Sequence, residues 1–151
     1  MLRSGSCELF WRPPHPFSNW TPSTFTVNNV TYTCAEQFMM AAKARLFGDL
    51  DSERKIMATS DPKQHKDLGR LVRGFDERVW NQHRVDIVVQ ALRAKFGQNS
   101  AFKEYLVGTE SKTLVEASPF APDNPKALDR KQWRGLNLLG EALMQVRSEL
   151  K

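Results

Sequence analysis

Helical periodicity is the feature of this sequence that most limits what it can fold into. Apolar residues recur at i, i+3, i+4, i+7 and i+11, the spacing of one helix face: Val85, Val88, Val89, Leu92 and Phe96. A second apolar stripe with helical spacing runs over residues 136–150: Leu136, Leu139, Leu143, Val146 and Leu150. The sequence therefore predicts two long helices that each bury one face.

Shorter helices are expected in the first two thirds of the chain. Strong helix formers run over residues 35–47 and stop at Gly48, which suits a left-handed C-terminal cap. Asp51 or Ser52 can cap a helix that runs to residue 58. Asp61 followed by a first-turn proline opens another helix that ends near residue 73, and residues 100–107 predict a further short helix.

Strands are expected only as short pieces. Residues 7–11 predict a strand before a loop rich in proline, and residues 113–115 are β-prone. Residues 25–27 and 30–32 flank Asn28-Asn29, and Asn tolerates the positive φ of a tight hairpin turn. We therefore expect an α+β, mainly α fold: one helix-rich domain over residues 1–151 with a small N-terminal hairpin.

Composition excludes several classes of protein. No apolar run approaches the eighteen residues that span a bilayer, and the first residues do not look like a secretory signal, so we expect a cytoplasmic protein without a membrane partner. Cys7 and Cys34 predict reduced thiols, and His15, His65 and His83 lack metal-ligand spacing. The net charge of +5 favours an anionic partner only weakly, since basic and acidic residues are interleaved.

A charged pair on one predicted helix is the first candidate site. Glu36 and Lys43 are seven residues apart, so they share one helix face about 10 Å apart along the axis, with Met39 and Met40 between them. This arrangement suits a pocket that grips a flat ring between a carboxylate and an amine. The alternative is an ordinary solvated face, or a lysine that pairs with an acid elsewhere.

Each of the other candidates also has a structural alternative. Asn19 and Trp20 follow the proline loop, where an amide and an aromatic ring could hold a base or ribose, or could serve as a cap and a core residue. Glu116 precedes a Ser-Pro turn and could stabilise positive charge on a substrate, or end a surface strand. Trp80 and Arg84, one helical turn apart, are expected to pack and pair structurally.

Taken in order, these pieces resemble the YbiA-like, or NADAR, family of N-glycosidases over nearly the whole chain. The matching pieces are short motifs spread from residue 17 to residue 144. They are Phe17-Ser18-Asn19-Trp20, Ala35-Glu36-Gln37-Phe38, Ala42-Lys43-Ala44, Leu68-Gly69-Arg70, Phe75-Asp76, Trp80 with Arg84, Leu114-Val115-Glu116-Ala117-Ser118-Pro119, and Trp133-Arg134-Gly135-Leu136-Asn137-Leu138-Leu139-Gly140-Glu141-Ala142-Leu143-Met144.

The resemblance implies hydrolysis of the C–N bond between ribose and a base-like amine. The implied substrates are ribosylamino-pyrimidine 5′-phosphates, early riboflavin-pathway intermediates, which would make the enzyme one of metabolite damage control. Relatives that remove ADP-ribose from guanine imply a second reading, with nucleic acid as partner. A third is a binding module that keeps an ADP-ribose or nucleotide pocket without turnover, and a fourth is a purely structural helical domain.

The resemblance also assigns roles. Both glycosidase reactions pass through a cationic sugar, so Glu36 and Glu116 are the candidates for stabilising C1′ and protonating the departing nitrogen. Lys43 either holds a phosphate or hydroxyl as a cation, or attacks C1′ as a neutral amine and forms an imine, the role that family likeness favours. Substrate contacts are assigned to five residues: Asn19, Trp20, Trp133, Arg12 and Arg70. No metal or redox cofactor is implied.

The chain departs from the family pattern at one place. Family members usually continue after the Glu-Ala-Ser-Pro motif with an aromatic residue, an Asp and an Ile-Trp-Gly-Ile-Gly segment. Here Pro119-Phe120 leads directly to Ala121-Pro122-Asp123-Asn124-Pro125, so roughly ten residues are absent. An Asp and a Trp expected in the family's pocket have no counterpart, and Asp123 is not assigned the role of that Asp.

Overall fold

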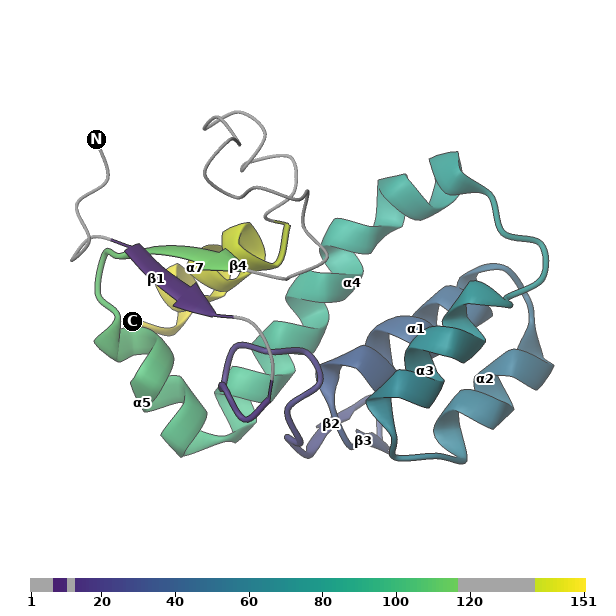
Figure 1. The fold of residues 1–151 in the computed structure, drawn as a ribbon, viewed down its shortest axis with the longest axis horizontal. Helices are drawn as coiled ribbons and strands as arrows, with labels where there is room; N and C mark the ends of the chain where they lie inside the picture. Colours follow the sequence, from purple (N-terminus) through teal and green to yellow (C-terminus); the bar gives the residue numbers. More distant parts are fainter. Residues whose placement is uncertain (1–6, 11–12, 117–137) are drawn as a thin grey trace.

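A computed structural model describes residues 7–10, 13–116 and 138–151 of the chain. These residues form six helices and four short strands (Figure 1). The order is β1 (Cys7–Phe10), β2 (Phe25–Val27), β3 (Val30–Tyr32), α1 (Ala35–Leu46), α2 (Leu50–Met57), α3 (Pro62–Arg70), α4 (Glu77–Gln98), α5 (Ser100–Gly108), β4 (Thr113–Glu116) and α7 (Leu138–Leu150). The expected α+β, mainly α fold class is confirmed.

Helix α4 separates two groups of elements. In Figure 1 it crosses between α1, α2 and α3 on one side and β1, β4, α5 and α7 on the other. Its buried residues serve both groups, because Leu92 and Phe96 lie in one apolar cluster while Ala91 lies in the other. The long helix predicted from its periodicity is therefore the element that joins the two cores.

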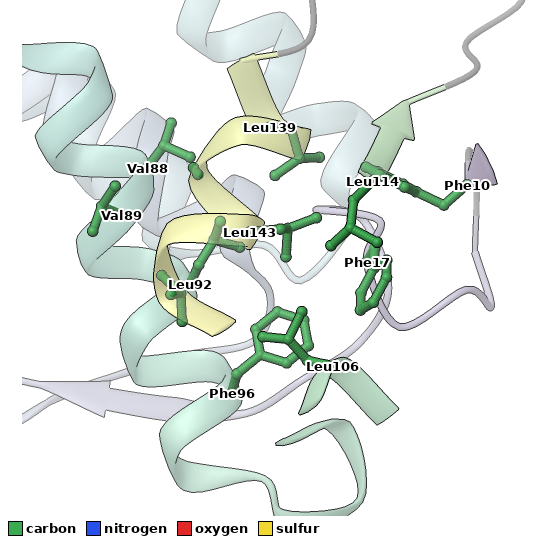
Figure 2. Close-up of a cluster of buried hydrophobic side chains, with 12 residues drawn as sticks. Phe10, Phe17, Val88, Val89, Leu92, Phe96, Leu106, Leu114, Leu139 and Leu143 are labelled. Atoms are coloured by element: carbon green, nitrogen blue, oxygen red, sulfur yellow. The ribbon is translucent and has the colours of Figure 1, made fainter. Parts of the chain in front are cut away.

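The first core, cluster 1, contains residues from β1, β4, α4, α5, α7 and the loop after β1. Figure 2 shows its side chains converging between α4 and α7. Its buried members are Phe10, Phe17, Val88, Val89, Leu92, Phe96, Leu106, Leu114, Leu139, Ala142, Leu143 and Val146. The second core, cluster 2, lies among β2, β3 and α1 to α4. Its buried members are Phe25, Tyr32, Ala35, Phe38, Ala41, Ala44, Ile56, Val72 and Ala91.

Two separate pairs of strands complete the described fold. β2 and β3 form the expected antiparallel hairpin, and both turn residues take positive φ, 51° at Asn28 and 67° at Asn29. β1 and β4 pair in parallel, with Phe10 opposite Glu116. Because the carboxyl ends of parallel strands lie together, the loop that leaves β1 starts beside the end of β4.

Several expected boundaries shift for identifiable reasons. Helix α2 begins at Leu50, since the side chain of Asp49, and not of Asp51 or Ser52, accepts the capping bond, from the Ser52 backbone N–H at 3.1 Å. Helix α3 ends at Arg70 rather than near residue 73. The backbone N–H of Arg73 donates to the side chain of Asp49 at 2.9 Å, so Arg73 does not continue the helix.

One member of the α4 stripe was wrongly expected to be buried. Val85 is 42% exposed, because the buried residues of α4 begin only at Val88. Among the described residues, no helix has the length and apolar character needed to cross a membrane.

Candidate active site

Glu36 lies in the first turn of α1, and the loop before the helix fixes that turn. The backbone N–H of Glu36 donates to the carbonyl of Asn19 at 3.0 Å. The Gln37 side chain accepts from the Thr33 backbone N–H at 2.7 Å and donates to two carbonyls at the end of α2. One of the free N–H groups at the helix start is therefore satisfied by the loop that carries Asn19.

Glu36 is buried, with 9% of its surface exposed. Burial raises the pKa of Glu36 from 4.5 to about 7; the cation of Lys66 opposes the rise, the carboxylate of Glu116 adds to it, and Lys43 opposes it. A carboxyl group with a pKa near neutrality exists in both protonation states at pH 7. Glu36 can therefore donate a proton to a leaving group or accept one from water.

Lys43 lies two turns further along α1, beside two aromatic rings. Its Nζ is 4.7 Å from the ring centroid of Phe75 and 5.6 Å from that of Trp80. Burial lowers the pKa of Lys43, Glu36 opposes that change, and the cation of Arg70 adds to it. A lowered pKa makes the neutral, nucleophilic amine more accessible near neutral pH.

Glu116 reaches the same region from the other side of the molecule. It is the last residue of β4, opposite Phe10 of β1, and it is half-buried. Burial raises the pKa of Glu116, and Lys66 lowers it. Since the carboxylate of Glu116 raises the pKa of Glu36, the two carboxyl groups predicted from sequence lie within electrostatic reach of each other.

Lys66 joins this site from α3, although the sequence gave no reason to select it. Its Nζ lies 5.8 Å from the ring centroid of Trp20, and its charge acts on both Glu36 and Glu116. The buried neighbour His65 fixes this part of α3: its Nε2 lies 2.6 Å from the Thr59 carbonyl. Lys66 thus lies beside the aromatic ring of the loop and within electrostatic reach of both carboxyl groups.

Asn19 and Trp20 are half-buried in the loop after β1. The Asn19 amide Nδ2 donates to the sulfur of Met39 at 3.4 Å. Its Oδ1 is buried and has no hydrogen-bond partner within the described part of the chain. A buried acceptor without a partner suits a donor that a ligand supplies, such as a ribose hydroxyl.

Arg70, the remaining described candidate, is an exposed residue at the end of α3 whose charge acts on Lys43. The structure therefore brings six of the predicted site residues into one region: Asn19, Trp20, Glu36, Lys43, Arg70 and Glu116. Arg12 and Trp133 lie outside the described residues. So does the 119–125 segment in which the chain departs from the family pattern.

Three further residues at this site were not assigned to it from the sequence. Lys66 lies on the same face of α3 as Arg70, four residues before it, but Lys63 shares that face, so the spacing alone does not select Lys66. Phe75 was part of a quoted motif without a role, and Trp80 was expected only to pack. Both rings lie within 6 Å of the Lys43 amine, as described above.

Comparison with known proteins decides the family. The model of the NADAR domain matches residues 9–151, which is nearly the whole chain. The chain belongs to the NADAR family. Its expected resemblance to this family is confirmed.

Three relatives illustrate the match. An N-glycosidase of Acanthamoeba polyphaga mimivirus is 40% identical over 148 residues, covering 89% of this chain and 87% of that protein. A riboflavin biosynthesis protein of Vibrio vulnificus is 29% identical over 147 residues, covering 94% of this chain but 38% of that protein. The NMR structure of the Escherichia coli protein YbiA has a TM-score of 0.78 and 25% identity, and the match covers 99% of this chain and 87% of that one.

These names agree with the expectation of an N-glycosidase, and the solved structure agrees with the fold. The enzyme class predicted for this NADAR chain is therefore confirmed.

Proposed function

We propose that this NADAR protein hydrolyses the N-glycosidic bond of a ribosylamino-pyrimidine 5′-phosphate, releasing the base and ribose 5-phosphate. The observation that carries the proposal is the buried Glu36, whose pKa is about 7, on the same helix as an amine with a lowered pKa. The riboflavin-related name of one relative supports the choice of substrate. Such an activity would remove reactive intermediates from a cytoplasmic pool.

The two carboxyl groups supply the acid and the anion that the reaction needs. The departing nitrogen requires a proton, and Glu36, which is substantially protonated at neutral pH, donates it. Positive charge that develops at C1′ requires a nearby anion, and Glu116 provides it: burial raises its pKa, but it is less buried than Glu36, and Lys66 favours its ionised form. The roles therefore follow from the different surroundings of the two groups.

Lys43 acts as the nucleophile in this mechanism. Its neutral amine attacks C1′, the C1′–N bond breaks, and the leaving nitrogen takes the proton of Glu36. The sugar ring then opens to give an imine between C1′ and Lys43. Water adds to the imine, releasing ribose 5-phosphate and the free amine, so one water is consumed for each bond cleaved.

Substrate binding uses the groups around these three residues. Trp20 offers a ring face to the base, and the buried Oδ1 of Asn19 accepts a hydrogen bond from a ribose hydroxyl. The exposed guanidinium of Arg70 suits the 5′-phosphate. Arg12 and Trp133 remain proposed contacts from the family pattern.

The test is release of ribose 5-phosphate from a ribosylamino-pyrimidine 5′-phosphate by the purified protein. We expect Glu36→Ala and Lys43→Ala each to lower kcat by about 10²-fold or more. Lys63→Ala, which removes an exposed lysine of α3, is the matched control and should retain wild-type turnover. Reduction with cyanoborohydride during turnover should attach the sugar to Lys43 and not to Lys63.

The outcomes separate the alternatives. No turnover by the wild-type protein contradicts the proposal. Release of ADP-ribose from modified guanine in DNA, measured in parallel with binding that weakens steeply with salt, would then support the nucleic-acid alternative. Saturable binding of ADP-ribose without turnover would support a binding module. Turnover without a trapped adduct would leave Lys43 its cationic role.

A further inference from the structure

Lys95 is a fully buried cation outside the proposed catalytic group. It lies on α4 with 0% of its surface exposed, and its Nζ is 5.1 Å from the ring centroid of Phe96 and 5.6 Å from that of Phe102. No carboxylate in the described residues forms an ion pair with it. Burial lowers the pKa of Lys95 to about 7. Burying such an amine costs free energy unless hydrogen bonds to the protein replace those it made to water.

The one hydrogen bond that the side-chain amine of Lys95 makes to the described chain goes to the loop that carries Asn19 and Trp20. Its Nζ donates to the carbonyl of Ser18 at 3.0 Å, across 77 positions of sequence. The same carbonyl accepts the backbone N–H of Thr21 at 3.2 Å. A carbonyl oxygen has two lone pairs, so Lys95 completes an acceptor that already closes the Ser18–Thr21 turn.

The turn is connected on both sides to the proposed site. The hydroxyl of Ser18 accepts the backbone N–H of Trp20 at 3.2 Å. The next carbonyl, that of Asn19, accepts the N–H of Glu36 at 3.0 Å. A displacement of Ser18 would therefore move the two loop residues and change the first turn of α1.

We propose that Lys95 is a positioning residue, which holds the Ser18–Thr21 turn so that Asn19 and Trp20 meet the ribosyl substrate in register with Glu36. The substrate part of this inference rests on the proposed function, whereas the effect on the turn does not. Lys95 acts through the backbone of Ser18 and does not contact the reacting atoms. A misplacement of about 1 Å at groups that position the substrate can cost about 10²-fold in kcat/KM.

The experiment compares Lys95→Met with Arg147→Met. Methionine keeps the length and the apolar stem of lysine but removes the donor. Arg147 is a matched control, because it too is a buried cation that donates to a backbone carbonyl, that of Lys112 at 2.8 Å, in the α5–β4 connection. Amide hydrogen exchange by NMR at Thr21 and Glu36, relative to the core amide of Leu92, reports the turn without any substrate.

We expect Lys95→Met to raise the relative exchange rates of the Thr21 and Glu36 amides at least about tenfold. We also expect the fold-increase in KM to be at least about ten times the fold-decrease in kcat. Arg147→Met should leave both relative exchange rates unchanged, even where it lowers overall stability. Unchanged exchange in a folded Lys95→Met protein would overturn the inference. If Lys95→Met changes the exchange rates but the wild-type protein shows no turnover, the inference about Lys95 stands and the proposed function is rejected.

A measurement on the wild-type protein keeps the inference testable where Lys95→Met does not fold. The held turn requires the Thr21 amide to exchange at least about tenfold more slowly than that of Thr24, an exposed residue three positions later. Equal rates would mean that the turn opens freely with Lys95 in place, which contradicts the inference.

Discussion

A buried carboxyl group with a pKa near 7 has opposite effects on stability and on chemistry. The folded protein binds the proton of Glu36 more tightly than the unfolded chain does, since burial raises its pKa from 4.5 to about 7. The free energy of unfolding therefore falls as pH rises between these two values, and the loss is complete above them. At neutral pH the protein retains a carboxyl group that destabilises the fold and serves proton transfer.

Glu36→Gln should separate these two effects. The amide keeps the shape of the carboxyl group but never ionises, so the variant should be more stable than the wild type at pH 8, by up to about 3 kcal/mol. The gain should nearly vanish at pH 4.5, while turnover is lost at both. Urea unfolding at the two pH values measures the gain. Glu104→Gln, on an exposed position of α5, is the control. An equal gain at both pH values would contradict the prediction.

Sequence reasoning at the residue scale found the groups whose spacing is local. Glu36 and Lys43 share a face of one helix, and the helical repeat alone places them together. Lys66 was missed because nothing in its surroundings distinguishes it from Lys63 on the same helix. Only the packing of α3 against the Trp20 loop gives it a role.

Helix ends, at the scale of elements, connect the site to its surroundings. Asp49 caps α2 through Ser52, and both of its oxygens also bind Arg73, at 2.9 and 3.1 Å. Its carboxylate side chain is 1% exposed. Arg73 lies just before Gly74, whose φ of 79° turns the chain toward Phe75 and the Lys43 amine. One side chain therefore fixes the start of α2 and the turn that brings Phe75 to the site.

Asp49→Ala should disturb both the start of α2 and the turn that brings Phe75 to the site. The hydrogen bonds from Arg73 and Ser52 hold the pKa of Asp49 well below its usual range, so its contribution to stability is present at neutral pH and is lost in acid. We expect a fall in Tm at pH 7 of roughly twice that of Asp61→Ala, which removes the exposed cap of α3. The difference should shrink at pH 3. Equal falls for the two variants would show that the bonds to Arg73 contribute nothing.

Helix boundaries were predictable only where the deciding bond is local. The cap of α3 at Asp61 and the end of α1 before Gly48 follow from neighbouring residues, and both are confirmed. The start of α2 was placed too late although its cap is local, because Asp49, Asp51 and Ser52 are all residue types that cap helices. The end of α3 was also placed too late, because the bond from the Arg73 N–H to Asp49 spans 24 positions. Patterns within a short window do not contain such a contact.

At the scale of the whole molecule, the proposed site lies where the two apolar clusters meet. Glu36 and Lys43 come from α1 beside cluster 2, whereas Glu116 ends β4 beside cluster 1. The parallel pairing of β1 with β4 joins segments more than a hundred residues apart, and no periodicity predicts it. The sequence motifs placed Glu116 in the site only through the family resemblance.

A site assembled from two clusters requires that they fold as one unit, and we propose that the chain is a single domain in this sense. Helix α4 contributes buried residues to both clusters, so unfolding of either one exposes an apolar face of α4 and destabilises the other. Leu143 of cluster 1 and Ile56 of cluster 2 are both fully buried. Truncation of either to alanine should cost about 2–5 kcal/mol.

Calorimetry on Leu143→Ala and Ile56→Ala tests this proposal. Each variant should keep one transition, moved down by roughly 5–15 °C, with equal calorimetric and van't Hoff enthalpies. Leu50→Ala, at a position 66% exposed, should move it little. Two transitions, of which each variant lowers only one, would mean that the clusters unfold independently. Ligand binding would then have to bring Glu116 to Glu36, and the pKa of about 7 would belong only to the assembled site.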